Sequence, residues 1–284
     1  MYEIELDVFS GRPNPRWVLA PKEAAEFTQR VRDGSTPTVP VDASEGILGY
    51  RGFIVRASGT EAESLGGTGH AIAFRVRSGV PGASTDPSAE QFLLQGVAGP
   101  GGLTDAEASA VSEQVQWDMA QTGSLDQADL AAAGVCSLYY TSWDDFSFWN
   151  GTRKPDNNCY NYAANYASNT FAQPGKQGGQ VFTALTVSAI KAAMQRDGWV
   201  LSCDTGNLRV ALVIWPGVDY HFYRKNLNDA GGSRWCHKPG RTNARNRDNS
   251  GNYITNPENC DRGPYTTWGG GHVFSNGVRS RTVR

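Results

Sequence analysis

The pattern of apolar and polar positions in the first part of the chain predicts alternating strands and helices. Apolar and charged residues alternate over residues 2–9, as in a half-buried strand, and residues 52–57 and 71–77 predict two further strands. Apolar residues three and four positions apart predict one helix over 21–33 and another over 104–123. This mixture of elements predicts an α+β fold class.

A candidate domain boundary follows these elements. Residues 122–134 are polar and rich in alanine, with a glycine near each end, which is typical of a linker. The sequence therefore predicts a small N-terminal α+β domain of unknown role over residues 1–121 and a second domain over residues 135–284. All five cysteines and three of the four histidines lie in the second domain.

Aromatic strands and glycine-rich loops make up the second predicted domain. Its predicted elements are a strand over 135–141, a helix over 186–197, and strands over 209–215, 219–224 and 235–237. Pro216 and Gly217 favour a tight turn, so the strands on either side of them are expected to pair as an antiparallel hairpin. From about residue 240 onward we expect mostly irregular structure.

Composition limits the class of protein. Hydrophobic residues make up 39% of the 284, and eight Trp, eleven Tyr and eleven Phe suffice for a packed core, which argues against a disordered chain. The longest strongly apolar run, 210–215, is too short to span a bilayer, so we expect no membrane span. Residues 1–20 do not resemble a secretory signal. We expect a cytoplasmic protein or one exported by a signal-independent route.

Cysteine and metal-ligand spacing decide the expected cofactor chemistry. Without a signal peptide, reduced thiols are the expectation, and an odd number of cysteines leaves at least one thiol unpaired within the chain. No CxxC or HExxH spacing occurs, and the oxygen-rich run 248–252 lacks the glutamate that closes an EF-hand loop. We therefore expect no metal and no cofactor.

Cys159 is the candidate nucleophile. Asn157 and Asn158 precede it at the start of an Ala/Tyr-rich run. Because Asn and Asp are preferred N-caps, this pattern predicts a helix with Cys159 in its first turn. There the helix dipole and the unpaired backbone N–H groups would stabilise a thiolate and lower the pKa of the thiol.

His221 is the candidate general base. It lies in the predicted strand 219–224, where alternation puts its side chain on the same face as Asp219 and Tyr223. If that face looks onto the Cys159 helix, the imidazole can accept the thiol proton.

A third group would orient the imidazole. His237, in the next predicted strand, is the first candidate for this role. Asp248 and Asn243 are alternatives, and His272 is an alternative for the base itself.

This order of residues resembles the papain-like thiol hydrolases of the NlpC/P60 and CHAP amidase type. The resemblance covers about residues 135–240 and rests on a Cys at a helix start, a His on one strand and a polar residue on the next. It implies an NlpC/P60-like α/β domain with an antiparallel sheet and long loops. It also implies Cys159 as nucleophile, His221 as base and His237 as the orienting residue.

The residues around Cys159 depart from that family pattern. Those enzymes usually have Asp before the cysteine and Ser or Gly after it, whereas Asn158 and Tyr160 flank the thiol here. Transglutaminase-like enzymes share the order Cys, His, Asp, and in that case Asp248 would take the third role.

The sequence thus predicts a thiol-dependent amide hydrolase, either a peptidase or an amidase, or an acyltransferase. A peptide or other amide-containing substrate would contact Tyr160, Tyr162 and Trp149. A bacterial effector or a cell-wall-active enzyme is the expected context.

Two alternatives come from composition and charge. Aromatic and glycine richness, with five cysteines that can cross-link, also suits a non-catalytic binding or structural protein. The net charge is −2, but residues 221–284 hold eleven Lys and Arg against four Asp and Glu, a balance of +7. That balance favours a nucleic-acid-acting protein as a second alternative. Since no nucleic-acid-binding motif is present, nucleic acid is not the expected partner.

Overall fold

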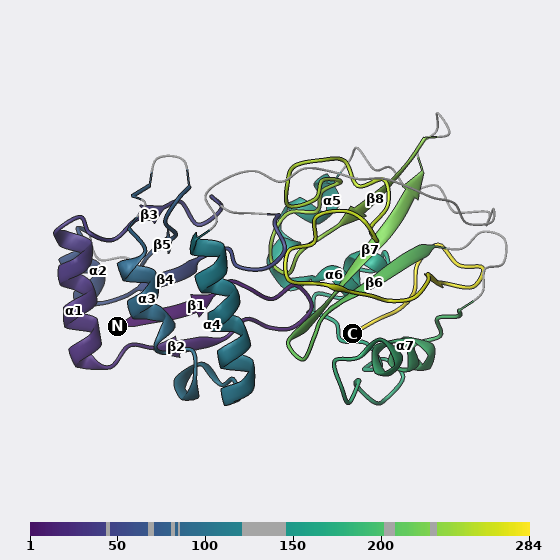
Figure 1. Cartoon of the computed structure of the whole chain (residues 1–284), viewed down its shortest axis with the longest axis horizontal. Helices are drawn as coiled ribbons and strands as arrows, with labels where there is room; N and C mark the ends of the chain where they lie inside the picture. Colours follow the sequence, from purple (N-terminus) through teal and green to yellow (C-terminus); the bar gives the residue numbers. More distant parts are fainter. Residues whose placement is uncertain are drawn as a thin grey trace. The chain divides into compact units, whose positions relative to one another are not determined.

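The computed structural model describes residues 1–43, 46–67, 71–80, 83–84, 86–120, 146–201, 208–227 and 232–284. The chain divides into two compact units. Unit 1 comprises residues 1–8, 14–45 and 50–123, and unit 2 comprises residues 9–13, 46–49 and 124–284. Each unit combines helices with an antiparallel sheet, which confirms the predicted α+β class (Figure 1).

Unit 1 is built on a five-stranded antiparallel sheet with the strand order β2-β1-β4-β5-β3. Its strands are β1 (Tyr2–Leu6), β2 (Arg16–Val18), β3 (Thr38–Val39), β4 (Phe53–Ala57) and β5 (Ile72–Val76). Its helices are α1 (Pro21–Arg32), α2 (Thr60–Ser64), α3 (Ser88–Leu94), α4 (Asp105–Ala120) and the 3-10 helix η1 (Gly99–Gly101). The predicted strands over 52–57 and 71–77 are confirmed as β4 and β5, and the predicted helices as α1 and α4.

Local capping and aromatic packing explain the helices of unit 1. The backbone N–H of Thr104 donates to Glu107 Oε2 at 3.0 Å and Thr104 Oγ1 accepts from the N–H of Glu107 at 3.3 Å, so the capping box in the sequence starts α4 as predicted. Phe27 of α1 lies edge-on to Tyr2 of β1, with ring centroids 5.2 Å apart. Phe27 also stacks on Phe92 of α3, which ties both helices to the sheet.

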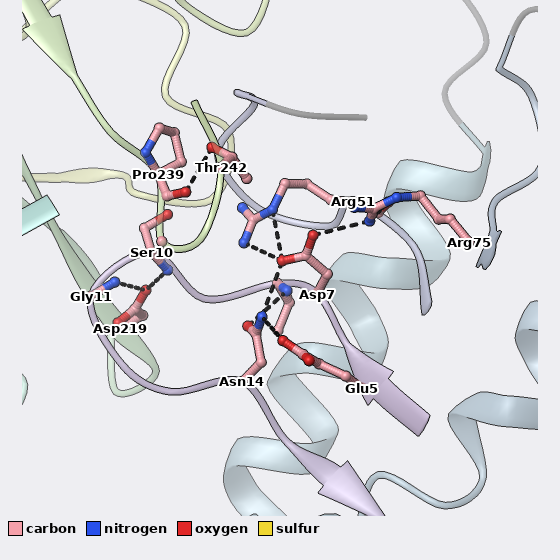
Figure 2. A network of polar contacts seen from close by, with 12 residues as sticks. Glu5, Asp7, Ser10, Gly11, Asn14, Arg51, Arg75, Asp219, Pro239 and Thr242 are labelled. Atoms are coloured by element: carbon pink, nitrogen blue, oxygen red, sulfur yellow. Dashed lines mark hydrogen bonds and ion pairs between the residues drawn. The ribbon is translucent and has the colours of Figure 1, made fainter. Parts of the chain in front are cut away.

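Strand β1 is more buried than its alternating pattern predicts. It pairs with β2 on one side and β4 on the other. Asp7, just after β1, is 1% exposed and accepts from Arg51 at 2.8 Å and Arg75 at 3.0 Å (Figure 2). Glu5 is fully buried against Arg16 at 2.7 Å. The expectation of a half-buried strand is wrong, because guanidinium partners compensate carboxylates on the face expected to be solvated.

Unit 2 contains a sheet in the order β10-β6-β7-β8, with β9 paired to β6. Its strands are β6 (Arg209–Trp215), β7 (Asp219–Leu227), β8 (Ser233–His237), β9 (Thr267–Trp268) and β10 (Val273–Phe274). Its helices are α5 (Ser147–Asn150), α6 (Cys159–Ala163), α7 (Val187–Arg196) and the 3-10 helix η2 (Lys154–Asp156). The predicted hairpin and the predicted helix over 186–197 are confirmed, and the predicted strand over 135–141 lies outside the described residues.

The two faces of the unit 2 sheet differ. One face packs against α6 and α7 in an apolar cluster that includes Ile190, Met194 and Leu212. The other face carries polar and aromatic groups, among them His221 and Tyr223, whose rings meet edge-on at 4.9 Å. Because both faces are covered, polar side chains on the second face are buried and need partners within the protein.

Candidate functional site

Asn158 caps the N-terminus of α6, as predicted. Its side-chain oxygen accepts hydrogen bonds from the backbone N–H groups of Tyr160 at 3.0 Å and Asn161 at 3.1 Å. Asn161 Oδ1 in turn accepts from the backbone N–H of Asn158 at 3.1 Å. This reciprocal capping box makes Cys159 the first residue of the helix, and the predicted local position of the thiol is confirmed.

The surroundings of Cys159 differ from those predicted for a nucleophile. The thiol is fully buried in the apolar cluster that also contains Tyr220 and Phe222. Burial, and then the charge of Asp219, raise the pKa of the Cys159 thiol well above its ordinary value. The thiol is therefore protonated at neutral pH, whereas the thiolate is the nucleophilic form.

His221 and His237 lie next to each other on β7 and β8. Nε2 of His221 is 2.9 Å from Nδ1 of His237, and Nε2 of His237 is 3.0 Å from the carbonyl oxygen of Arg247. Because a carbonyl only accepts, His237 donates from Nε2 and its Nδ1 accepts from Nε2–H of His221. Burial, and then the nearby charge of Arg245, lower the pKa of His237 to about 3, so this ring is uncharged at neutral pH.

Strand alternation separates the histidine pair from the thiol. His221 lies between Tyr220 and Phe222, which share the apolar cluster with Cys159. Since successive side chains of a strand point to opposite faces, His221 points away from that cluster. Its ring contacts, with centroids 4.9, 5.0 and 5.9 Å away, are with Tyr223, His237 and Tyr265. The structure brings His221 and His237 together but places Cys159 in a different neighbourhood.

The three side chains predicted to bind substrate are core residues. Tyr160 and Tyr162 are fully buried, and Trp149 is 4% exposed. The hydroxyl of Tyr160 donates to Asp197 Oδ2 at 2.7 Å, and Tyr162 lies edge-on to Trp149 with centroids 5.3 Å apart. Since these side chains are packed inside the protein, they do not form an accessible cleft.

Asp248 and His272, the alternative site residues, make other contacts. The two carboxylate oxygens of Asp248 accept from the backbone N–H groups of Asn252 at 2.8 Å and Asp261 at 3.2 Å. Asp248 therefore holds its own loop together. Nδ1 of His272 accepts from the guanidinium of Arg209 at 2.6 Å.

Asp219 is the centre of a buried network that the sequence did not reveal (Figure 2). One carboxylate oxygen accepts from the backbone N–H groups of Ser10 at 2.6 Å and Gly11 at 3.1 Å, and the other accepts from Arg12 at 3.0 Å. The hydroxyl of Tyr265 donates to the same carboxylate at 2.6 Å. The segment over 10–12 is thus fixed by a buried acceptor.

The glycine of this segment is sterically required. A Cβ atom at Gly11 would lie 2.5 Å from the ring of Tyr220 and 2.6 Å from its carbonyl oxygen. Only glycine fits, because real Cβ contacts are essentially never this short.

The described thiols are buried or half-buried and form no disulfide. These are Cys159, Cys236 and Cys260, while Cys136 and Cys203 lie outside the described residues. Burial raises the pKa of Cys260 to about 12. Neither Cys159 nor Cys260 is therefore activated by its surroundings.

In the part of the chain that the structure describes, no group of three or more His, Cys, Asp or Glu side chains is arranged to hold a metal ion. No helix there has the length and apolar character needed to cross a bilayer.

Comparison with known proteins gives a match to a named relative. The chain is 43% identical over 143 residues to insoluble matrix shell protein 1 of Ruditapes philippinarum, and the alignment covers 49% of this chain and 91% of that protein. No protein-family model matches the chain, and no solved structure matches it.

This similarity overturns the predicted activity. The relative is named as a matrix protein of a shell and not as an enzyme. The prediction of a thiol-dependent amide hydrolase or acyltransferase is wrong, and so are the classes hydrolase, thiol protease and amidase. The buried, protonated thiol of Cys159 gives a physical reason, because the predicted activation by the helix N-terminus is outweighed by desolvation.

Proposed function

The chain belongs to the same family as insoluble matrix shell protein 1 of Ruditapes philippinarum, and we therefore propose that it is a non-catalytic structural protein of an insoluble matrix. The observation that carries the proposal is the extent of the similarity. The alignment, at 43% identity, covers 91% of the relative, which is nearly all of that protein. We therefore infer that the aligned half of this chain carries the property that retains the relative in its matrix.

The polar interior of unit 2 supports a structural role. The carboxylate of Asp219 is used by three backbone N–H groups and a tyrosine hydroxyl. Lys238 is fully buried, and its ammonium donates to the carbonyl oxygens of Lys154 and Gly240, each at 2.7 Å, and of Asn157. Asp219 and Lys238 therefore hold loops in place through their hydrogen bonds, whereas an enzyme would direct such charged groups toward a substrate.

Sedimentation with insoluble particles tests this function. The purified whole chain is mixed with suspensions of chitin, calcium alginate gel and calcium carbonate, spun down and washed. We expect the protein to stay in the pellet with at least one of these materials. In parallel, the chain is incubated with casein and N-acetylated peptides, and newly formed amino groups are measured; we expect none.

The variant Cys159→Ala is the matched control. A structural protein retains its sedimentation in this variant, since the buried thiol takes no part in binding. The proposal is contradicted by a wild-type chain that stays in the supernatant with all three materials. It is contradicted equally by a release of amino groups that the variant abolishes.

A further inference from the structure

A row of three side chains crosses one end of the sheet in unit 2. Arg209 of β6 lies opposite Lys225 of β7, and Lys225 lies opposite Trp235 of β8. Directly opposite residues of neighbouring strands share a face of the sheet. Two cations and an indole ring therefore stand side by side on three successive strands.

His272 and a third cation complete this cluster. The ring of His272 stacks on Trp235, with centroids 5.0 Å apart and an interplanar angle of 23°. The guanidinium of Arg209 and the ammonium of Lys225 lie 5.8 and 5.9 Å from the centroid of Trp235. Lys191 donates to the carbonyl oxygen of the residue before His272 at 3.3 Å. We call these five side chains the cationic cluster.

The charges of the cationic cluster repel one another. Burial, and after it the charge of Arg209, lower the pKa of Lys225. Burial, and after it the charges of Arg209, Lys225 and Lys191, lower the pKa of His272 to about 4, so this ring is uncharged at neutral pH. Among the described residues, no carboxylate forms an ion pair with any of the three cations.

Arg209 also keeps an unused hydrogen-bond donor. The residue is 8% exposed, and its Nε has no acceptor within the described ranges. A buried donor without an acceptor lowers stability, and like charges placed opposite each other in a sheet lower it further. An anion bound between Arg209 and Lys225 would remove both of these destabilising effects.

The surroundings of the cationic cluster favour one class of anion. Trp235 is 3% exposed and covered by His272, so a base cannot stack on it. Trp268 is half-buried and meets His272 edge-on at 5.9 Å, which puts a second indole beside the cations. An acidic polysaccharide matches this combination, because its widely spaced anionic groups can meet the cations while a sugar ring packs against the indole of Trp268.

We propose that Arg209, Lys225 and Lys191 bind sulfate or carboxylate groups of an acidic polysaccharide, with Trp268 against a sugar ring. This inference rests on the proposed function and names the partner class through which the chain is retained in its matrix. The polysaccharide supplies the acceptor for Arg209 and neutralises the cross-strand pair.

Binding to soluble polymers tests the site. The whole chain is titrated by calorimetry with dextran sulfate, polygalacturonate and uncharged dextran. We expect binding to at least one of the two acidic polymers and none to uncharged dextran. The double variant Lys191→Gln/Lys225→Gln should bind the acidic polymer about tenfold more weakly or worse, because two charge-assisted contacts are lost. The control Lys22→Gln/Lys176→Gln removes the same charge at exposed positions and should bind like the wild type.

Thermal stability separates binding from a role in folding. Because Lys225 faces Arg209, the single variant Lys225→Gln should keep or raise the melting temperature while it weakens polymer binding. A residue that only supported the fold would lower both. Trp268→Ala should weaken binding to whichever acidic polymer the wild type binds.

Two results overturn the site. One is a Lys191→Gln/Lys225→Gln variant that binds like the Lys22→Gln/Lys176→Gln control. The other is single-stranded DNA or polyaspartate binding more tightly than either acidic polysaccharide. After either result, sedimentation of the wild-type chain with insoluble particles would still support the proposed function. A wild-type chain that stays in the supernatant contradicts the proposed function itself.

Discussion

Nε2 of His221 lies 2.9 Å from Nδ1 of His237, and both residues are fully buried on one face of the sheet, on the adjacent strands β7 and β8. Because Nε2 of His237 donates to the carbonyl of Arg247, only one arrangement of protons leaves both rings neutral. In this arrangement Nε2 of His221 donates to Nδ1 of His237. Protonation of His237 would remove its acceptor nitrogen and bury a charge. The pair is therefore sensitive to acid.

The first prediction follows from this pair. The pKa of His237 is about 3 in the folded protein and about 6.5 in the unfolded chain, so only the unfolded chain takes up this proton between these values. The free energy of unfolding should fall as the pH falls through this interval, by about 1.4 kcal/mol per pH unit from this group. Urea titrations at pH 7.5, 6, 5 and 4 measure the slope.

Two variants assign that slope. His237→Gln should flatten the pH dependence relative to the wild type, whatever its effect on stability at pH 7.5. His272→Gln should flatten it by nearly the same amount down to about pH 4, because the pKa of His272 is lowered to about 4 and above that pH this proton, too, is taken up only by the unfolded chain. A His237→Gln protein with the wild-type slope would show that this histidine does not titrate as described.

The second prediction concerns Cys159. Burial raises the pKa of this thiol well above its ordinary value, so the native protein should react with iodoacetamide at Cys159 only very slowly between pH 5 and 9. Unfolding in urea should make the same cysteine react at the rate of an ordinary thiol. Peptide mapping of the labelled protein gives both rates. Rapid labelling of native Cys159 below pH 8 would contradict the buried, protonated thiol.

The case of Cys159 shows what local sequence patterns can and cannot predict. The start of α6 was predictable, since N-cap chemistry depends on residues within one helical turn, here Asn158 and Asn161. The pairing of the segments 209–215 and 219–224 as a hairpin followed from the turn at Pro216 and Gly217 for the same reason. The pKa of the thiol was not predictable, because it depends on desolvation by side chains distant in sequence, such as Phe222.

Long-range polar contacts escaped the sequence analysis for a related reason. Asp219 and Ser10 are 209 positions apart, and nothing near either residue indicates that they meet. The alternation in β1 was read correctly as a strand, but the burial of Glu5 and Asp7 depends on arginines supplied by other strands. Alternation of apolar and polar residues indicates a strand. Whether the polar face of that strand is buried depends on the charged side chains that other strands supply.

The third prediction tests the network around Asp219. Asp219→Asn replaces one acceptor oxygen by an N–H₂ group that faces backbone donors, so we expect a loss of about 2–4 kcal/mol in the free energy of unfolding. Tyr265→Phe removes only one hydrogen bond to the same carboxylate and should cost about 1 kcal/mol. Amide exchange at Ser10 and Gly11 should be faster in Asp219→Asn than in the wild type. Unchanged exchange at these amides would mean that another group holds the segment.

The last prediction compares a buried and an exposed ion pair in unit 1. Asp7 is enclosed by Arg51 and Arg75, which are 0% and 2% exposed, and these charges lower the pKa of Asp7 although burial by itself would raise it. Asp7→Asn leaves two buried guanidinium groups without a counter-charge and should cost about 3–5 kcal/mol. Glu3→Gln breaks the contact of a carboxylate that is 42% exposed with Arg56 at 3.4 Å, and should cost less than about 1 kcal/mol. Urea unfolding followed by circular dichroism measures both. Equal costs for the two variants would mean that burial adds nothing to the Asp7 pairs, which would contradict the compensation described for β1.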